Sequence, residues 1–428
     1  MLLGLLASAA ATAAAAARPV VYQHATFNVR NVSDVVYGQG LQCADGQPTP
    51  AGCTPMDLLL DMATPVDGPA TPRPAYIIMH GGGWTGGGRT DAWTRASSQF
   101  YASRGFVAFD ISYRLKQGEK TTGYYPTSWP TPPLPGGDSI IGKAYPATRD
   151  VKAAVRFVRA NAAKYGVDPA RVALAGGSAG AISSIAVGNV DEDDYKMELI
   201  GSDPTLQSTH LNASSKVQCV VSHWGAGYAV EIVQSADPAN RTRYGPGAAP
   251  IIEFHGDKDT TVPYADALAV QAAYRAANSS GTLAYELHTL PGCPHASWCF
   301  GCGSQCKCKI EHDWCDAMDE TALPSVAQHL DLDLVPGGGP TPAPASPTPA
   351  PPTPPTPPTP PTPPTPPAPA SCEATLQALC PAAVDTNAKE CEKCAEKNEK
   401  ALQAVGCTTK QVTSLCKARK PPLVAYKS

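Results

Sequence analysis

The sequence predicts an α/β fold in which a mostly parallel sheet is covered by helices on both faces. A proline-rich linker and a small, disulfide-rich helical module follow it. Three observations support this prediction. Short apolar runs with strand character alternate with segments of helical spacing, a pattern typical of parallel sheets. Glycine-rich motifs follow directly after several of these runs. A Thr-Pro-Pro repeat then separates this region from a cysteine-rich end.

The N-terminal residues 1–17 predict a signal peptide. An apolar start is followed by an alanine tract whose last residues suit cleavage before Arg18. We therefore expect a secreted, extracellular protein. A membrane-spanning helix is the competing interpretation, but a stretch of about 17 residues that is mostly alanine lies at the short edge of spanning length.

Residues 18–335 are expected to form one globular domain. Six apolar runs have the length and composition of strands: 75–79, 106–110, 172–175, 217–222, 251–254 and 284–288. Three segments between them have helical character: 92–104, 146–165 and 264–277. In parallel sheets covered by helices, active sites lie at the carboxyl ends of the strands.

Residues 336–370 predict an extended linker, because their Pro, Thr and Ala composition can neither bury a core nor form a helix. Residues 371–428 hold six cysteines, and cysteines recur with apolar residues at helical spacing, as in Cys391, Cys394, Leu402 and Val405. Thr408 with Gln411 suits a capping box. A module this short is expected to need disulfides.

The composition limits the classes of partner that the chain is expected to bind and the cellular compartment in which it is expected. The net charge of -4 argues against a nucleic-acid partner. Fifteen cysteines in an exported chain predict disulfides, in blocks at 43 and 53, at 293–315 and at 372–416. A zinc site is the alternative for the second block. Cys219 is left over within an apolar run, where a buried thiol is expected. Four Asn-x-Ser/Thr sequons, at Asn31, Asn212, Asn240 and Asn278, are compatible with glycosylation.

The segment around Ser178 is the strongest single motif. Gly176, Ser178 and Gly180 fill the G-x-S-x-G pattern between a strand and a helix, where glycines relieve crowding at a strained turn and expose the hydroxyl. A purely structural turn would have the same pattern, so a catalytic role for Ser178 also depends on the other motifs.

Three further motifs follow strands. The run 80–84, His-Gly-Gly-Gly-Trp, offers backbone N–H groups that approach a ligand closely, as an oxyanion hole requires. The run 255–259, His-Gly-Asp-Lys-Asp, offers two carboxylates, Asp257 and Asp259. His295 stands just beyond the last predicted strand.

Together these motifs resemble the α/β-hydrolase fold, in its HGGG-type carboxylesterase branch that includes feruloyl-esterase-like enzymes. The resemblance also rests on Ser-Tyr-Arg-Leu at 112–115, and it covers roughly residues 55–335. It implies a Ser178 nucleophile, an Asp259 acid preferred to Asp257, and a His295 base. It also implies an oxyanion hole, which we place at the N–H groups of Gly82, Gly83 and Ala179, and neither a metal ion nor an organic cofactor.

Aromatic residues near these motifs are candidates for substrate binding. The long segment 117–142 carries two of them, and the others adjoin the motifs. The candidates are Trp84, Tyr125, Trp129, Trp224 and Trp298.

The sequence therefore predicts a secreted serine carboxylic-ester hydrolase that uses a Ser-His-Asp triad. Acyl or feruloyl esters of polysaccharide, or another polyester, are the expected substrates. The C-terminal module, by analogy with secreted polysaccharide-degrading enzymes, is expected to bind a polysaccharide or cell surface. A serine exopeptidase of related fold and a catalytically silent adhesion protein on the same fold are the alternatives.

Overall fold

The computed structural model describes two compact units, residues Met1–Pro344 and Ala345–Ser428. The residues described are 18–44, 50–68, 71–117, 121–130, 132–135, 138–278, 283–296, 314–336, 376, 388–398, 402–403 and 407–418. The predicted signal peptide and nearly all of the predicted linker lie outside these residues. The domain boundaries at 335 and 370 therefore stay predictions.

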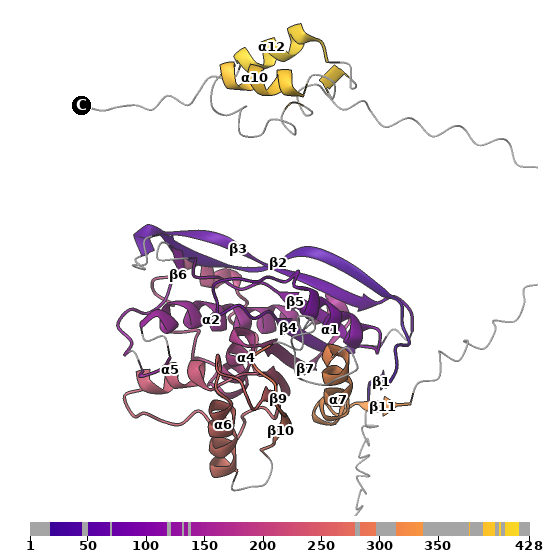
Figure 1. The fold of residues 1–428 in the computed structure, drawn as a ribbon, viewed down its shortest axis with the longest axis vertical. Coiled ribbons are helices and arrows are strands. Elements are labelled where there is room, and N and C mark those ends of the chain that lie inside the picture. The colour runs from indigo at the N-terminus through magenta and orange to yellow at the C-terminus, as the bar shows by residue number, and fades with distance from the viewer. Residues whose placement is uncertain are drawn as a thin grey trace, which may run out of the picture. The chain divides into compact units, whose positions relative to one another are not determined.

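A nine-stranded sheet forms the centre of the first unit (Figure 1). Its strands, in spatial order, are β10 (Tyr285–Leu290), β9 (Ile251–Gly256), β8 (Cys219–His223), β7 (Val167–Gly177), β4 (Arg73–Met79), β5 (Val107–Ile111), β3 (Cys53–Pro65), β2 (Val29–Ala44) and β6 (Thr121–Gly123). The strands from β10 to β5 pair in parallel, and β3, β2 and β6 pair antiparallel. Two short strands, β1 (Val20–Tyr22) and β11 (Asp333–Val335), form a separate parallel pair.

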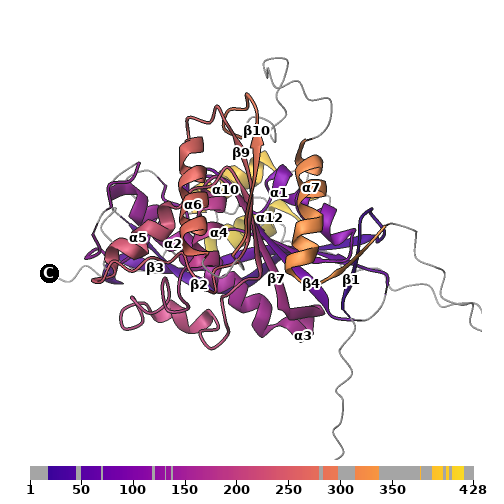
Figure 2. The same cartoon turned by 90° about the horizontal axis from the view of Figure 1, so that it is seen from below.

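Helices cover both faces of the sheet (Figure 2). One face packs against α2 (Asp138–Ala160), α4 (Ala179–Asn189), α5 (Tyr228–Ala236) and α6 (Tyr264–Ala277), and the other against α1 (Ala92–Ala102) and α7 (Trp314–His329). The short helix α3 (Ala162–Tyr165) follows α2, and 3-10 turns occupy Pro50–Gly52 and Pro204–Ser208. Alternate residues of each buried strand face the two layers: Ile77 packs on the α2 side and Ile78 on the α1 side.

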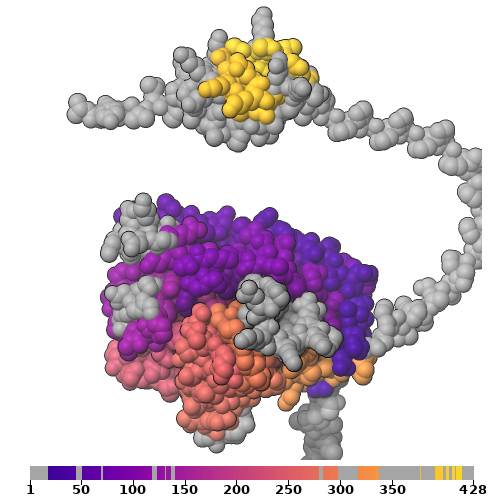
Figure 3. Space-filling model, viewed as in Figure 1, coloured from indigo at the N-terminus to yellow at the C-terminus, as the bar shows by residue number. Residues whose placement is uncertain are grey.

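The predicted parallel strands and the three predicted helices are all present, with shifted ends. The long antiparallel pair β2 and β3 was not predicted, because polar residues interrupt its apolar alternation and its first half is largely exposed. These N-terminal strands (indigo) form one side of the unit, and residues near α6 (salmon) form the opposite side (Figure 3). Cys43 and Cys53 face each other across the β2–β3 pair and form a disulfide, as predicted.

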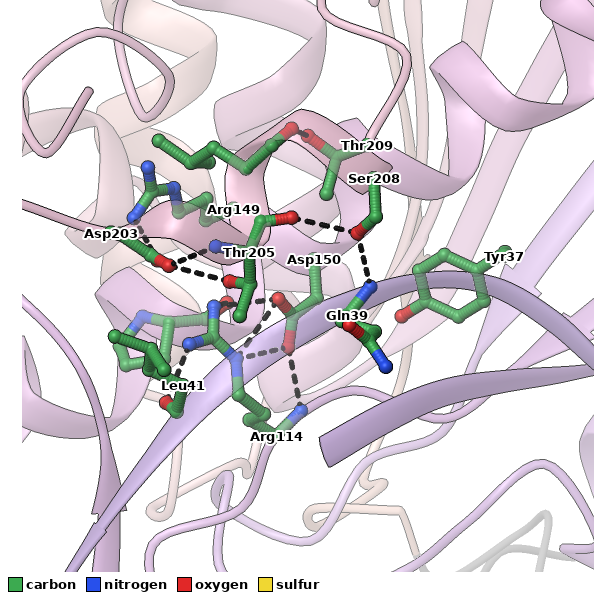
Figure 4. A network of polar contacts seen from close by, with 12 residues as sticks. Tyr37, Gln39, Leu41, Arg114, Arg149, Asp150, Asp203, Thr205, Ser208 and Thr209 are labelled. Carbon is green, nitrogen blue, oxygen red and sulfur yellow. Dashed lines mark hydrogen bonds and ion pairs between the residues drawn. The ribbon is translucent and has the colours of Figure 1, made fainter. Parts of the chain in front are cut away.

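A buried ion pair ties the antiparallel strands to helix α2 (Figure 4). The guanidinium of Arg114, in the loop after β5, donates to both carboxylate oxygens of Asp150 at 2.7 to 3.1 Å and to the carbonyl of Leu41 on β2 at 2.8 Å. The two charged side chains are 1% and 2% exposed. Arg149, the residue directly before Asp150 in the helix, pairs with Asp203. Two buried ion pairs therefore stabilise the position of helix α2, and the apolar spacing of its sequence does not predict them.

The second unit is described in part. Two of its helices are α10 (Ala388–Lys397) and α12 (Thr409–Ala418), which a disulfide between Cys391 and Cys416 joins. The predicted capping box is present, because the Thr408 N–H donates to Gln411 Oε1 at 2.9 Å and the Gln411 N–H to Thr408 Oγ1 at 3.3 Å. Across all described residues, no helix combines the length and the apolar character that crossing a bilayer requires.

Candidate active site

Ser178 stands at a sharp turn between strand β7 and helix α4. Its backbone φ is 53°, a left-handed conformation that is uncommon for a residue with a side chain. The flanking glycines explain how the turn closes. A Cβ on Gly176 would lie 2.5 Å from the backbone of Gly180, and a Cβ on Gly180 would lie 2.6 Å from the carbonyl oxygens of Met79 and His80. Only glycine fits these two positions, so the sequence pattern has a direct steric cause.

The structure brings the three predicted triad residues together. His295 Nε2 lies 3.0 Å from Ser178 Oγ, and His295 Nδ1 lies 2.6 Å from Asp259 Oδ2. Ser178 follows β7, Asp259 follows β9 and His295 follows β10, so all three occupy the carboxyl edge of the sheet. The His295 side chain is 16% exposed and the Asp259 side chain is fully buried.

The two carboxylates of the 255–259 motif have different surroundings. Asp259 Oδ1 accepts from the N–H groups of Thr261 and Val262 at 2.9 and 3.0 Å. Burial opposes the ionisation of Asp259, but hydrogen bonds from His255 and His295 lower its pKa well below its usual range. Asp257 is partly exposed and accepts from the Gly292 N–H at 2.7 Å. Asp257 thus fastens the loop before His295 and does not contact the imidazole.

The glycine loop after β4 lies against the nucleophile turn. Gly82 and Gly83 have φ values of 94° and 61°, and a Cβ on Gly81 would lie 3.4 Å from the Ser178 Cβ. Among the described residues, none accepts a hydrogen bond from the N–H of Gly82, Gly83 or Ala179. Ala179 begins helix α4, where backbone N–H groups and the helix dipole favour an anion. These amides are available to a negatively charged oxygen.

Tyr113 braces this loop, a role that we did not assign from the sequence. Its hydroxyl donates to the carbonyls of His80 and Gly81, both at 2.9 Å, and its ring stacks on the His80 imidazole at 4.2 Å. The motif Ser-Tyr-Arg-Leu was the available signal, because Tyr113 and Arg114 are its two central residues.

The predicted aromatic residues occupy different environments. Trp84 is 4% exposed and donates to Ser183 Oγ, while Trp224 is 1% exposed and packs edge-on to His295 with ring centroids 6.0 Å apart. These two indoles lie in the packed interior beneath the site. Tyr125 and Trp129 are half-buried, and Trp129 packs against Tyr145. Trp298 lies outside the described residues.

In the cysteine block next to His295, Cys293 is the residue whose side chain is described. This residue is buried, and its carbonyl accepts from the Lys258 N–H at 3.1 Å. The side chains of the other five cysteines of the block lie outside the described residues, so the choice between disulfides and zinc stays a prediction. Cys219 is a buried free thiol on β8, as predicted, and burial raises its pKa. Where residues are described, no three potential metal ligands gather in a site.

Comparisons with known proteins show similarity to esterases. The BD-FAE family model matches residues 142–244, a segment that contains Ser178 but ends before Asp259 and His295. Esterase LipC of Mycobacterium tuberculosis (strain ATCC 25618 / H37Rv) is 28% identical over 256 residues, covering 55% of this chain and 56% of LipC. Esterase LipQ of the same organism is 29% identical over 254 residues, covering 53% and 51%. The chain thus spans about half the length of the curated relatives it matches.

Solved structures include a propionate-bound thermophilic esterase, Est2 of Thermogutta terrifontis. It is 22% identical, with a TM-score of 0.48, over 73% of this chain and 97% of that one. The family match and the sequence relatives confirm the predicted resemblance to α/β-hydrolase esterases. The sheet order and the strand–serine–helix turn are those of the predicted fold class. The six-cysteine module stays a prediction.

Proposed function

We propose that this protein is a carboxylic-ester hydrolase with Ser178 as its nucleophile. The observation that carries the proposal is the continuous hydrogen-bonded chain from Ser178 through His295 to Asp259, beside three backbone amides without a partner among the described residues. The similarity to esterases supports the same reaction class.

The chemistry follows from this arrangement. A serine hydroxyl is a poor nucleophile until a neutral imidazole accepts its proton. His295 Nε2 takes the proton of Ser178 as the oxygen attacks the ester carbonyl, and Asp259 holds the imidazole in the required tautomer and stabilises its cation. The protonated His295 then gives the proton to the leaving alkoxide, so an alcohol departs and an acyl-enzyme remains.

The backbone amides stabilise the tetrahedral intermediate. The N–H groups of Gly82 or Gly83 and of Ala179 donate to its oxyanion, and each such donor contributes about 3 kcal/mol to transition-state binding. Water, activated by His295, attacks the acyl-enzyme in the same way and releases the acid. Each step uses groups of this chain and water alone.

The test is active-site labelling together with turnover. The purified protein should react covalently with a fluorophosphonate and hydrolyse p-nitrophenyl acetate. Ser178→Ala should abolish both, with unchanged thermal unfolding, since only one partly exposed hydroxyl is removed. Ser183→Ala is a matched control, because this buried serine lies on the same helix α4. Labelling that persists in Ser178→Ala would refute the assignment.

We further propose that the enzyme is secreted and acts on esters of a polymer. The signal-like N-terminus, the proline-rich linker and the cysteine-rich end support this proposal. Acyl or feruloyl esters of polysaccharide, or another polyester, are the proposed substrates, and a tethered module would raise the local concentration of the enzyme on such a surface.

Truncation after Val335 tests this second proposal. The shortened enzyme should hydrolyse soluble esters as before and act more slowly on particulate material. The isolated residues 371–428 should be retained on cell-wall fractions. Equal rates on particulate substrate and no retention would refute a binding role for the module.

A further inference from the structure

Two buried ionisable residues of β9 lie directly behind the acid of the triad. The side chains of Glu253 and His255 are 0% exposed. His255 Nδ1 lies 3.1 Å from Glu253 Oε1, and His255 Nε2 lies 2.9 Å from the Val262 carbonyl and 3.4 Å from Asp259 Oδ2. The triad mechanism described above leaves both side chains without a role.

The hydrogen-bond geometry defines the charge of His255. A neutral imidazole has one N–H group and an imidazolium has two. Both ring nitrogens of His255 face oxygen atoms, and beside an ionised Glu253 both of these oxygens accept, so the ring then satisfies both contacts as an imidazolium. Burial opposes this charge, but Asp259 and Glu253 raise the pKa of His255 to about 10. A buried cation therefore lies between two carboxylates.

Glu253 connects this cation to the rest of the site. Its Oε1 also accepts from the Gly225 N–H at 2.9 Å, and Gly225 follows Trp224, whose ring packs against His295. In the same segment, the His223 carbonyl accepts from the Ser178 N–H at 2.9 Å. The carboxylate thus fastens a segment that contacts both the nucleophile and the base.

We propose that Glu253 and His255 are positioning residues for Asp259, so that the chain of polar contacts that starts at Ser178 has five members. His255 competes with His295 for the same oxygen, Asp259 Oδ2, and partly neutralises the negative charge of the Asp259 carboxylate. Glu253 in turn holds His255 in place and adds a negative charge one step further away. The basicity of His295 is therefore set by both residues.

Two tyrosines also lie near this pair. The Tyr264 ring, from helix α6, lies 5.8 Å from the His255 ring. Tyr285, on the neighbouring strand β10, has a pKa raised by its own burial and by Glu253. The charges that face His255 among the described residues are thus Glu253 and Asp259.

The inference rests on the proposed function, and its test is the pH dependence of Ser178 labelling by a fluorophosphonate. Labelling needs no natural substrate, and its rate rises with pH as the base loses its proton. Glu253→Gln keeps the shape and removes a negative charge, so the midpoint should fall by about 0.5 to 1 unit. His255→Asn removes the positive charge nearest to Asp259, so the midpoint should rise by about the same amount.

Asp257→Asn is the matched control. It removes a partly exposed carboxylate from the same loop. Because water screens this charge, the midpoint of labelling should move by less than about 0.2 unit. Shifts in opposite directions for Glu253→Gln and His255→Asn support the proposal, because a loss of packing alone would not reverse sign. Midpoints equal to that of the wild type in both variants overturn it and leave the pair a purely structural role.

Two further outcomes are decisive. If His255→Asn does not fold, Glu253→Gln decides alone by the same criterion. If the wild-type protein is not labelled at any pH, the proposed function fails together with the inference, whereas labelled wild type with unshifted variants refutes the inference only.

Discussion

Removing the carboxylate of Asp150 should destabilise the first unit strongly. The substitution Asp150→Ala leaves the Arg114 guanidinium buried, with only the carbonyls of Leu41 and Pro146 as acceptors at 2.8 and 3.4 Å. It also deprives the Arg114 backbone N–H of its 2.8 Å acceptor. Breaking a buried pair by removing one partner costs about 3 to 5 kcal/mol, because an uncompensated charge remains in the interior.

The measurement is the free energy of unfolding from urea denaturation, followed by circular dichroism. Arg241→Ala is the control, because its ion pair with Asp237 is formed by an arginine side chain that is 65% exposed. Exposed pairs of this kind contribute about 0 to 1 kcal/mol. The double variant Arg114→Met/Asp150→Leu removes both charges and should recover part of the loss, since apolar residues of similar volume can replace a buried pair.

The reasoning fails under two results. Asp150→Ala with a loss no larger than that of Arg241→Ala would mean that water reaches the guanidinium or that the region relaxes. A double variant less stable than Asp150→Ala would mean that the ion pair itself, and not the orphaned charge, holds strand β2 to helix α2.

Three other predictions follow from the same structure. Asp259→Asn should lower kcat by about 10⁴-fold, because an amide cannot hold the His295 tautomer, while Asp257→Asn should change it little; esterase kinetics with the reverse ranking would refute the assignment of the acid. Burial raises the pKa of Asp110 to about 7, so the folded carboxyl keeps its proton to a higher pH than the unfolded one, and stability is lost as pH rises between about 4 and 7. The stability gained by Asp110→Asn should therefore grow across that interval, by at most about 4 kcal/mol, and stay constant above it; a gain independent of pH in urea titrations would contradict this. Cys43→Ala/Cys53→Ala opens a loop with a sequence separation of 10 and should lower the free energy of unfolding of the first unit by about 2.5 kcal/mol under oxidising conditions; equal stability with and without the bond would refute this entropic argument.

The local features of the site were determined by the sequence. The turn at Ser178 needs residues without a Cβ at 176 and 180, and that steric requirement is visible as a pattern of letters. Buried parallel strands are likewise continuous apolar runs, so six strands could be predicted with modest errors at their ends. The capping box at Thr408 is readable for the same reason, since its partners lie three residues apart.

Pairings between distant residues were decided only by the tertiary structure. Arg114 and Asp150 are 36 positions apart, and neither breaks a pattern that would announce a buried ion pair. The spacing of the 255–259 motif left two carboxylates open, and the approach of the β10 loop places His295 on Asp259 and Gly292 on Asp257. The sequence likewise predicted Trp84 and Trp224 as substrate-binding residues, whereas packing of the helices on the sheet buries both.

The charge of His255 is the clearest example of a property that the sequence alone does not predict. In the sequence, the position of His255 after an apolar run indicates a turn, and Glu253 is a polar interruption of that run. Their role depends on a fully buried environment in which a carboxylate must be paired and an imidazole between two acceptors must be charged. Burial is a property of the folded chain as a whole, so the sequence could fix the residues of the nucleophile turn but not the electrostatics behind the acid.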